Sequence, residues 1–544
     1  MAASMVDKQR VLQELTLGSR IAEEEAGELA SYFVETEQWR RVWLGDVDVV
    51  YGPKGSGKSA IYSTLVAREN ELFDRGILIA PAVKPRGSGA FEGMTDDPPT
   101  SEAEFVGLWK IYFLLLIAEK IEDFGMDSDA TRQLIQILTD AKLRPPGRRT
   151  LKSVLTSARN YVRRIFSVHE IEPSLQLDPT GGFSISGRIQ FSEPTPEERA
   201  KGAVQVDDLF ELADEIWAGA DYQVWLLLDR LDVAFEGSSA LESNALRALF
   251  RVYLDVLPYE NLRLKIFLRT DIWRTITANG FREASHITRD LTLAWDRPSL
   301  LRLVVQRLIK NQNIQDFYDA SQNDVLSSNI GQQDFFDRVY PRQVESGPNQ
   351  SQTFDWCMRR TQDGTGQTAP RELIHLVTAA RDAQLRFLDL GIPPPAGQAL
   401  FTPQALKDAL PEVSEARLTR TMYAEFAELK TFMEALRGGK TNHNSASLSA
   451  AWGLPLESAR ETAERLAEIG FFERRKSETG GNLFWVPFLY RPALELVQGS
   501  ADGVVPPFRE DGAMKWPEND DDLFGDFFEE DVPGEALPKS PTAP

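Results

Sequence analysis

The stretch GPKGSGKS, residues 52–59, decides the fold, because it fits the pattern G-x-x-x-x-G-K-[ST] at every position. The apolar run VDVVY at 47–51 predicts a strand before it, and residues 59–69 predict a helix after it. In such a unit, backbone N–H groups of the loop and the helix N-terminus surround a phosphate group. The predicted nucleotide-binding residues are Gly52, Pro53, Lys54, Gly55, Ser56, Gly57, Lys58 and Ser59.

Two of these side chains have distinct expected roles. Lys58 would neutralise the β- and γ-phosphates, and the Ser59 hydroxyl would bind Mg²⁺. A phosphate loop of this kind also needs an acidic residue at the end of a second strand, and the run WLLL at 225–228 ends in Asp229. Asp229 is therefore the second predicted metal ligand, directly or through water. The expected cofactors are ATP and Mg²⁺, and the expected activity is ATP hydrolysis.

Candidates for activating the attacking water follow Asp229. Asp232 is the nearest carboxylate and Glu236 is the second candidate, while capping of the next helix is the alternative role of Asp232. Many hydrolytic ATPases of this class carry Glu directly after the aspartate of the second strand, where this chain carries Arg230. We therefore expect slow turnover.

A third apolar run, at 264–268, ends in three polar residues. One of Arg269, Thr270 and Asp271 would contact the γ-phosphate or the attacking water, and we take Thr270 as the catalytic candidate. The alternative is ordinary capping at the strand end.

A further cation is expected from a helical lid. The segment TAPREL at 368–373 begins a helix with Pro370 in its first turn, so Arg371 projects from the helix start and would reach the γ-phosphate. A surface salt bridge is the alternative role of Arg371. An arginine finger from a neighbouring copy would come from Arg274 or Arg282.

The composition limits the class of protein. Of 544 residues, 42% are hydrophobic and 26% are charged, which is the globular range. The formal charge of −22 excludes a protein that coats nucleic acid or anionic membrane through bulk positive charge. Residues 501–544 hold 12 Asp or Glu against 3 Lys or Arg, and they predict a disordered acidic tail. Its segment 520–531 mixes carboxylates with four large apolar residues, which favours a docking motif slightly over a solubilising end.

Cysteine, histidine and hydropathy exclude other classes. Cys357 is the single cysteine, which excludes an intramolecular disulfide and a cysteine zinc site, and a buried thiol is expected. The four histidines do not stand at metal-ligand spacing, so a transition-metal enzyme is not expected. The longest apolar run, 111–118, is shorter than the ~20 residues that span a bilayer. We expect no membrane contact and a cytoplasmic location.

The expected fold class is α/β, with the parallel sheet of a P-loop NTPase, a helical lid subdomain and a C-terminal winged-helix domain. The predicted parts are an N-terminal helical segment at 1–43, a P-loop domain at 44–296 with a β-hairpin insertion at 172–191, a helical lid at 297–440, a winged helix at 441–500 and the tail at 501–544.

The winged-helix prediction rests on two helices, at 446–451 and 456–469, followed by two strands at 471–475 and 483–486. The second helix would enter the major groove in a DNA-binding protein. It carries four glutamates against two arginines, which would repel phosphates, so docking of a protein or a lid role is favoured. The wing residues that keep DNA binding as an alternative are Arg474, Arg475 and Lys476.

Five segments together resemble a bacterial P-loop ATPase family that is named after a cyanobacterial open reading frame. They are YGPKGSGKSAIY, WLLLDRLDVAFEG, LKIFLRTDIW, LAWDRPSLLRLVVQRL and TAPRELIHL. The family is similar to the KAP and STAND ATPases and, more distantly, to initiator-type AAA+ proteins, and the resemblance spans residues 15–500. It implies an ATP-dependent switch in a bacterial cell, often encoded near defence or mobile-element genes.

The sequence is compatible with three functions. The favoured one is a nucleotide-dependent switch in bacterial antiviral defence or mobile-element biology, acting through an unknown protein effector, with homo-oligomers as an option. The alternative is an initiator- or loader-type ATPase that binds DNA through the winged helix. A nucleotide kinase is the weakest, because no acceptor site is recognisable.

Overall fold

The computed structural model describes residues 2–19, 29–82, 101–144, 150–171, 189–200, 202–231, 239–278, 280–476 and 481–501. The chain divides into two compact units. The first, which we call the P-loop unit, consists of Gly18–Lys310 and Ala369–Arg371. The second, the helical unit, consists of Met1–Leu17, Asn311–Thr368 and Glu372–Pro544.

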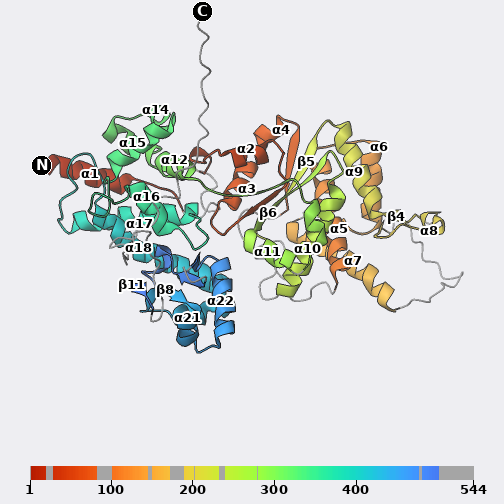
Figure 1. Cartoon of the computed structure of the whole chain (residues 1–544). Coiled ribbons are helices and arrows are strands. Elements are labelled where there is room, and N and C mark those ends of the chain that lie inside the picture. The colour runs from red at the N-terminus through yellow and green to blue at the C-terminus, as the bar shows by residue number, and fades with distance from the viewer. Residues whose placement is uncertain are drawn as a thin grey trace, which may run out of the picture. The chain divides into compact units, whose positions relative to one another are not determined.

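A five-stranded parallel sheet forms the centre of the P-loop unit (Figure 1). Its strand order is β2-β5-β6-β1-β7. The strands are β1 (Val49–Gly52), β2 (Ile77–Pro81), β5 (Gln223–Leu228), β6 (Leu262–Arg269) and β7 (Asp290–Thr292). The apolar runs of the sequence therefore form a parallel α/β sheet, as predicted.

Alternate side chains of each strand enter two different cores. Val49 and Tyr51 of β1 belong to the core that contains α5 (Glu102–Asp123). Val50, between them, belongs to the core on the opposite face, with α3 (Lys58–Ala67). Because side chains of a strand point alternately to the two faces, continuous apolar runs bury the sheet on both sides. Figure 1 shows the helices on both faces.

The remaining elements of the P-loop unit are helices and one short strand pair. They are α2 (Glu37–Trp43), α4 (Glu69–Phe73), α6 (Asp129–Asp140), α7 (Leu151–Ile171), α8 (Pro196–Ala200), α9 (Val206–Gly219), α10 (Ser239–Val256), α11 (Thr270–Ala278), α12 (Arg297–Ile309), β3 (Ile189–Gln190) and β4 (Val204–Gln205).

Two predicted segments of this part of the chain are described only in part. In the N-terminal helical segment predicted at 1–43, α1 (Ala2–Glu14) ends before Leu15, and Gly18 adopts a left-handed φ of 77°. The hairpin predicted at 172–191 lies largely outside the described residues. Its described end, β3, pairs in parallel with β4, and the hairpin stays a prediction.

The helical unit contains most of the helical stretch predicted at 297–440, whose first helix, α12, belongs to the P-loop unit. After α1 its helices are α13 (Gln312–Tyr318), α14 (Gln322–Leu326), α15 (Asn329–Val339), α16 (Thr353–Thr361), α17 (Pro370–Asp389, which begins in the P-loop unit), α18 (Pro403–Arg417), α19 (Tyr423–Glu425) and α20 (Lys430–Glu434). Cys357 is buried in α16, as predicted, and its burial raises the pKa of the thiol.

The end of the helical unit combines two helices with a four-stranded sheet of order β11-β8-β10-β9. Along the chain the elements are β8 (Lys440–Asn444), α21 (Ser445–Trp452), α22 (Leu456–Glu468), β9 (Glu473–Lys476), β10 (Asn482–Trp485) and β11 (Val497–Ser500). Asn444 and Ser447 form a capping box at the start of α21, and Gly453 ends it with a left-handed φ of 65°. Only Ala501 of the predicted tail lies within the described residues.

In the described ranges, no helix has the length and apolar character needed to cross a membrane.

Candidate functional site

The glycine-rich loop joins β1 to α3, as predicted from the sequence. Gly55 and Gly57 have φ angles of 86° and 99°, a left-handed conformation that glycine adopts without a steric penalty. Gly52 ends β1, and a Cβ placed there would lie only 2.4 Å from the Ser56 Oγ, so a larger residue would displace Ser56. These three positions explain why the turn requires glycine.

Lys58 is buried within this loop. Its Nζ donates hydrogen bonds to the carbonyl oxygens of Gly52 at 2.7 Å and Pro53 at 2.9 Å. These bonds hold the ammonium group over the loop, and only 9% of the residue is exposed. The Ser56 Oγ is also buried, and it has no hydrogen-bond partner among the described residues.

The other predicted loop residues lie at the mouth of the same turn. Pro53, Lys54 and Gly55 are half-buried and lie between β1 and α3. Ser59 is the second residue of α3 and is half-buried. The eight predicted residues therefore lie together.

The carboxyl ends of the three central strands carry the other predicted polar residues. Gly52 at the end of β1 pairs with Arg269 at the end of β6, and β6 lies between β1 and β5. Asp229 directly follows β5 and is 4% exposed. Because carboxyl ends of parallel strands meet at one edge, the sheet brings Asp229 and Arg269 to the edge that carries the loop.

An electrostatic contact places Asp229 near α3. Burial and, secondarily, the negative charge of Asp229 raise the pKa of Tyr62, which lies on α3. A serine hydroxyl and an aspartate carboxylate are oxygen ligands of the kind that Mg²⁺ prefers, and Mg²⁺ is commonly bound by one or two protein groups together with substrate phosphates. Ser59 and Asp229 therefore fit a magnesium site at this edge.

The polar residues at the end of β6 differ in whether their side chains already form hydrogen bonds. Arg269 donates from Nε to Asp271 Oδ1 at 3.1 Å and from its terminal nitrogen to Oδ2 at 2.6 Å. Asp271 therefore holds the Arg269 guanidinium. Thr270 Oγ1 is buried and has no hydrogen-bond partner within the described ranges. Of the three candidates, the Thr270 hydroxyl is the one whose bonding capacity is not used by a neighbouring side chain.

The predicted catalytic carboxylates, Asp232 and Glu236, lie outside the described residues. Arg230, directly after Asp229, has a left-handed φ of 56°, which is strained for a residue with a Cβ.

Arg371 is the second residue of α17, and the three residues Ala369–Arg371 belong to the P-loop unit although the rest of α17 does not. Its Nε is buried without a hydrogen-bond partner in the described part of the chain. Arg274 on α11 and Arg282 in the following 3-10 helix (Arg282–His286) are both exposed. The finger role of these two arginines stays a prediction.

Trp295 is a residue of this site that the sequence analysis did not single out. It follows β7, the neighbour of β1, and its indole Nε1 donates to the carbonyl oxygen of Ser56 at 2.8 Å. The contact depends on the pairing of two strands that are about 240 residues apart along the chain. No local pattern in the sequence could have revealed it.

A buried charge cluster, which we call the strand-base cluster, lies at the other end of β1. The carboxylate of Asp48 accepts from Lys265 Nζ at 2.8 Å and from Arg289 Nε at 2.6 Å. Asp48 and Lys265 are 1% exposed. Burial lowers the pKa of Lys265 to about 8, against the opposing effect of Asp48. The cluster anchors the strand that ends in the loop.

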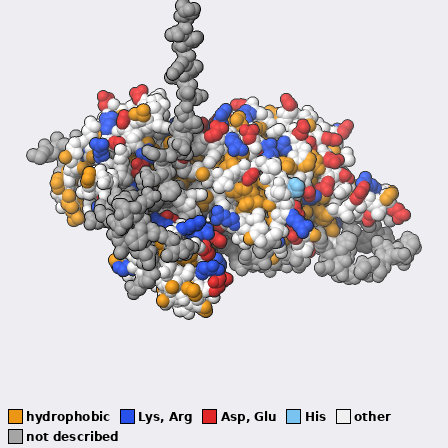
Figure 2. Space-filling view, in the orientation of Figure 1, with side chains coloured by type: hydrophobic (Ala, Val, Ile, Leu, Met, Phe, Trp, Pro, Cys, Tyr) orange, Lys and Arg blue, Asp and Glu red, His pale blue; other side chains and the backbone are white. Residues whose placement is uncertain are grey.

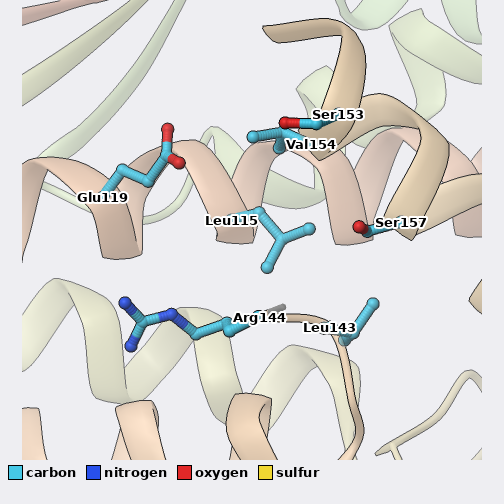
Figure 3. Close-up of a pocket in the computed structure, with 7 residues that line it drawn as sticks. All are labelled: Leu115, Glu119, Leu143, Arg144, Ser153, Val154 and Ser157. Carbon is cyan, nitrogen blue, oxygen red and sulfur yellow. The ribbon is translucent and has the colours of Figure 1, made fainter. Parts of the chain in front are cut away.

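A small pocket elsewhere in the P-loop unit includes no residue of the loop (Figure 3). Leu115 and Glu119 of α5 face Arg144, with Ser153, Val154 and Ser157 of α7 beside them. The guanidinium of Arg144 forms an ion pair with Glu122. The pocket is therefore separate from the predicted nucleotide site.

Comparison with known proteins assigns no family. No family model matches the chain, and no curated protein matches it. Two solved structures of the Aeropyrum pernix ORC2 protein are similar in part. The ADPNP–ADP complex has 14% identity over 86% of this chain and 92% of that chain, with a TM-score of 0.37. The ADP form has 13% identity over 90% and 96%, with a TM-score of 0.31. These values are too low to support a conclusion about family or function.

Proposed function

We propose that this protein is an ATPase that acts as a nucleotide-dependent switch. The observation that carries the proposal is the loop between β1 and α3, in which Gly55 and Gly57 adopt left-handed conformations around the buried Lys58. Such a loop presents backbone N–H groups and one cation to a nucleotide phosphate. The neighbouring Asp229 and Ser59 supply oxygen ligands for Mg²⁺.

Each residue has a role in this proposal. Lys58 neutralises negative charge on the β- and γ-phosphates, and the loop N–H groups orient the same phosphates. Ser59 and Asp229 would hold Mg²⁺, which would supply positive charge to offset that of the phosphates. Thr270 contacts the γ-phosphate or the attacking water with its unpartnered hydroxyl. Asp232, or Glu236 in its place, polarises that water.

Slow hydrolysis would suit a switch. The position directly after Asp229 is Arg230, whose cation cannot act as a general base at neutral pH. A long-lived ATP state would then hold one conformation until hydrolysis or nucleotide release ends it.

Arg371 could transmit the presence of the γ-phosphate to the helical unit. It would contact the γ-phosphate from the first turn of α17, and the following residue, Glu372, already belongs to the helical unit. Glu372 is fixed there by a hydrogen bond of 3.0 Å from Arg417, which also forms an ion pair of 3.5 Å with Asp363. Differential binding of ATP and ADP by Arg371 would therefore act on the residue that precedes the buried Glu372–Arg417 pair.

The output of the switch is proposed from the sequence resemblance. It favours a partner protein effector in bacterial defence or mobile-element biology, and it leaves homo-oligomers open. Contact of α22 with such a partner would fit its charges, since Glu457, Glu461 and Glu468 are exposed on that helix.

A DNA-binding initiator or loader is the second candidate. The order strand, two helices and two strands from β8 to β10 supports the winged-helix interpretation. However, Arg474 of the wing lies 3.1 Å from Glu464 of α22, so part of its charge is already neutralised. Figure 2 shows acidic and basic side chains next to one another in the region of α22. This mixed surface favours a protein partner over phosphates.

ATP turnover by purified protein tests the first proposal. We expect measurable, slow phosphate release that depends on Mg²⁺, and Asp232→Asn should keep ATP binding while lowering the turnover rate. Equal turnover in Asp232→Asn would move the water-polarising role to Glu236 or to another subunit. Salt-sensitive DNA binding by the full chain that disappears in Arg474→Ala would favour the second candidate instead.

A further inference from the structure

The indole of Trp295 contacts one peptide unit of the phosphate loop. Its Nε1 donates a hydrogen bond of 2.8 Å to the carbonyl oxygen of Ser56. A Cβ placed on Gly57 would lie 3.7 Å from Cζ2 of the same ring. The indole therefore lies beside both residues that share this peptide bond, and all three residues belong to the P-loop unit.

Peptide planarity gives this contact a consequence for phosphate binding. The C=O of Ser56 and the N–H of Gly57 belong to one peptide unit, and in a trans peptide they point in opposite directions. The peptide bonds in the described ranges include no cis bond. A hydrogen bond that holds the Ser56 carbonyl toward the indole therefore holds the Gly57 N–H away from it.

The hydrogen bond from Trp295 matters for the orientation of this peptide because residue 57 is a glycine. Its φ of 99° lies in a region that glycine enters freely, and glycine can also leave that region at little cost. Without an external contact, the peptide between Ser56 and Gly57 could rotate and turn its N–H elsewhere. The Ser56 Oγ does not provide that contact, because it has no hydrogen-bond partner among the described residues.

We propose that Trp295 is a positioning residue that orients the Gly57 N–H toward the phosphate of a bound nucleotide. The inference rests on the proposed function, in which loop N–H groups bind the phosphate. An N–H that is already oriented lowers the ordering cost of binding, so the effect appears in nucleotide affinity.

The same residue links the loop to the start of α12. Trp295 directly precedes Asp296, the N-cap of α12, whose carboxylate accepts from the Ser299 N–H at 2.9 Å. A phosphate that tightens the loop would therefore also restrain the first turn of this helix. α12 ends at Ile309, two residues before the helical unit resumes at Asn311.

Trp295→Phe in the full chain tests the inference, because phenylalanine keeps a ring and lacks the N–H. Trp452→Phe is the matched control, since Trp452 Nε1 donates to the Phe432 carbonyl at 2.9 Å in the helical unit. Calorimetric titration with ATP and with ADP should show about three- to tenfold weaker binding in Trp295→Phe, the range expected for one lost hydrogen bond. The control should bind as the wild type does, and both variants should melt near the wild-type temperature.

The outcomes separate this inference from the proposed function. A wild-type protein that binds neither nucleotide overturns the proposed function. A wild type that binds nucleotide, with Trp295→Phe binding equally well, overturns only the role of Trp295. A second measurement needs no variant: ADP should slow hydrogen exchange in residues 297–303 of the wild type. Unchanged exchange there, with ADP bound, would overturn the link to α12.

Discussion

Replacing Asp48 with asparagine should strongly destabilise the P-loop unit. The Asp48 carboxylate is fully buried between two cations, Lys265 at 2.8 Å and Arg289 at 2.6 Å. The two cations differ in exposure, because the Lys265 side chain is 1% exposed and that of Arg289 is 34% exposed. Asparagine keeps the shape but removes the charge. Arg289 can then turn toward water, whereas Lys265 is left buried without its counter-ion.

Two independent estimates give the size of the effect. Removing one partner of a buried ion pair costs about 3–5 kcal/mol. Lys265 could instead release its proton, which from its ordinary pKa of 10.5 costs about 5 kcal/mol at pH 7. Burying the unpaired Lys265 cation cannot cost more than its deprotonation does, so the cost of deprotonation is an upper limit. We therefore expect the free energy of unfolding of the P-loop unit to fall by about 3–5 kcal/mol at pH 7.

The pH dependence supplies a second signature. Burial lowers the pKa of Lys265 to about 8 in the folded protein, below its ordinary 10.5. Between these values the unfolded chain binds more protons, so the stability contributed by this lysine rises with pH from about 8 to 10.5. Without Asp48 the pKa of Lys265 falls further, and the rise begins at lower pH. The difference in the free energy of unfolding between Asp48→Asn and the wild type should therefore become smaller as the pH rises toward 8.

Native-state hydrogen exchange in increasing urea measures the free energy of unfolding of the P-loop unit, because peptides from β1 and β6 report on this unit alone. Asp207→Asn is the matched control, because Asp207 is 39% exposed and its partner Lys110 keeps a second carboxylate, Asp255, at 2.7 Å. The control should change stability by less than about 1 kcal/mol. A loss below about 1 kcal/mol in Asp48→Asn, or a difference that does not vary with pH, would refute the reasoning.

Two further substitutions test local strain and close packing. Arg230→Gly should stabilise the P-loop unit by about 0.5–1 kcal/mol, because Arg230 holds a left-handed φ of 56°; a lower urea midpoint would contradict this. Gly364→Ala should destabilise the helical unit by about 1–3 kcal/mol, since its Cβ would lie 2.1 Å from the Phe472 carbonyl oxygen. Gly481→Ala is its control, as a Cβ there meets no atom within 4 Å. Hydrogen exchange in α22 measures the loss, and equal exchange in both variants would argue against the clash.

Local sequence signals were sufficient for the loop and for the three central strands of the sheet, β1, β5 and β6. Residues 52–59 form the predicted turn because their glycines and lysine stand at positions that backbone geometry requires, and the apolar runs beside them bury both faces of a sheet. The break in the N-terminal helix also had local signals, in Gly18 and in Thr36, whose side chain caps α2. Such residues indicate where helices begin and end more directly than apolar residues do.

Contacts between distant strands could not be predicted in this way. The bond from Trp295 to Ser56 and the ion pair between Asp48 and Lys265 join residues more than 200 positions apart. Each depends on which strand lies beside β1, and the apolar runs do not specify that order. The sequence predicts that polar residues lie at the strand ends, but the strand order of the folded sheet determines which of them are in contact.

The most direct test of the proposed switch is ATP binding by the full chain and by Lys58→Ala. Lys58 is the buried cation that donates to the Gly52 and Pro53 carbonyl oxygens in the loop, and Lys440→Ala, an exposed lysine of β8, is the control. In calorimetric titrations with Mg²⁺-ATP, we expect the wild type and Lys440→Ala to bind one nucleotide per chain and Lys58→Ala to show no binding. An unchanged ATP affinity in folded Lys58→Ala, or a folded wild type without nucleotide affinity, would contradict the account.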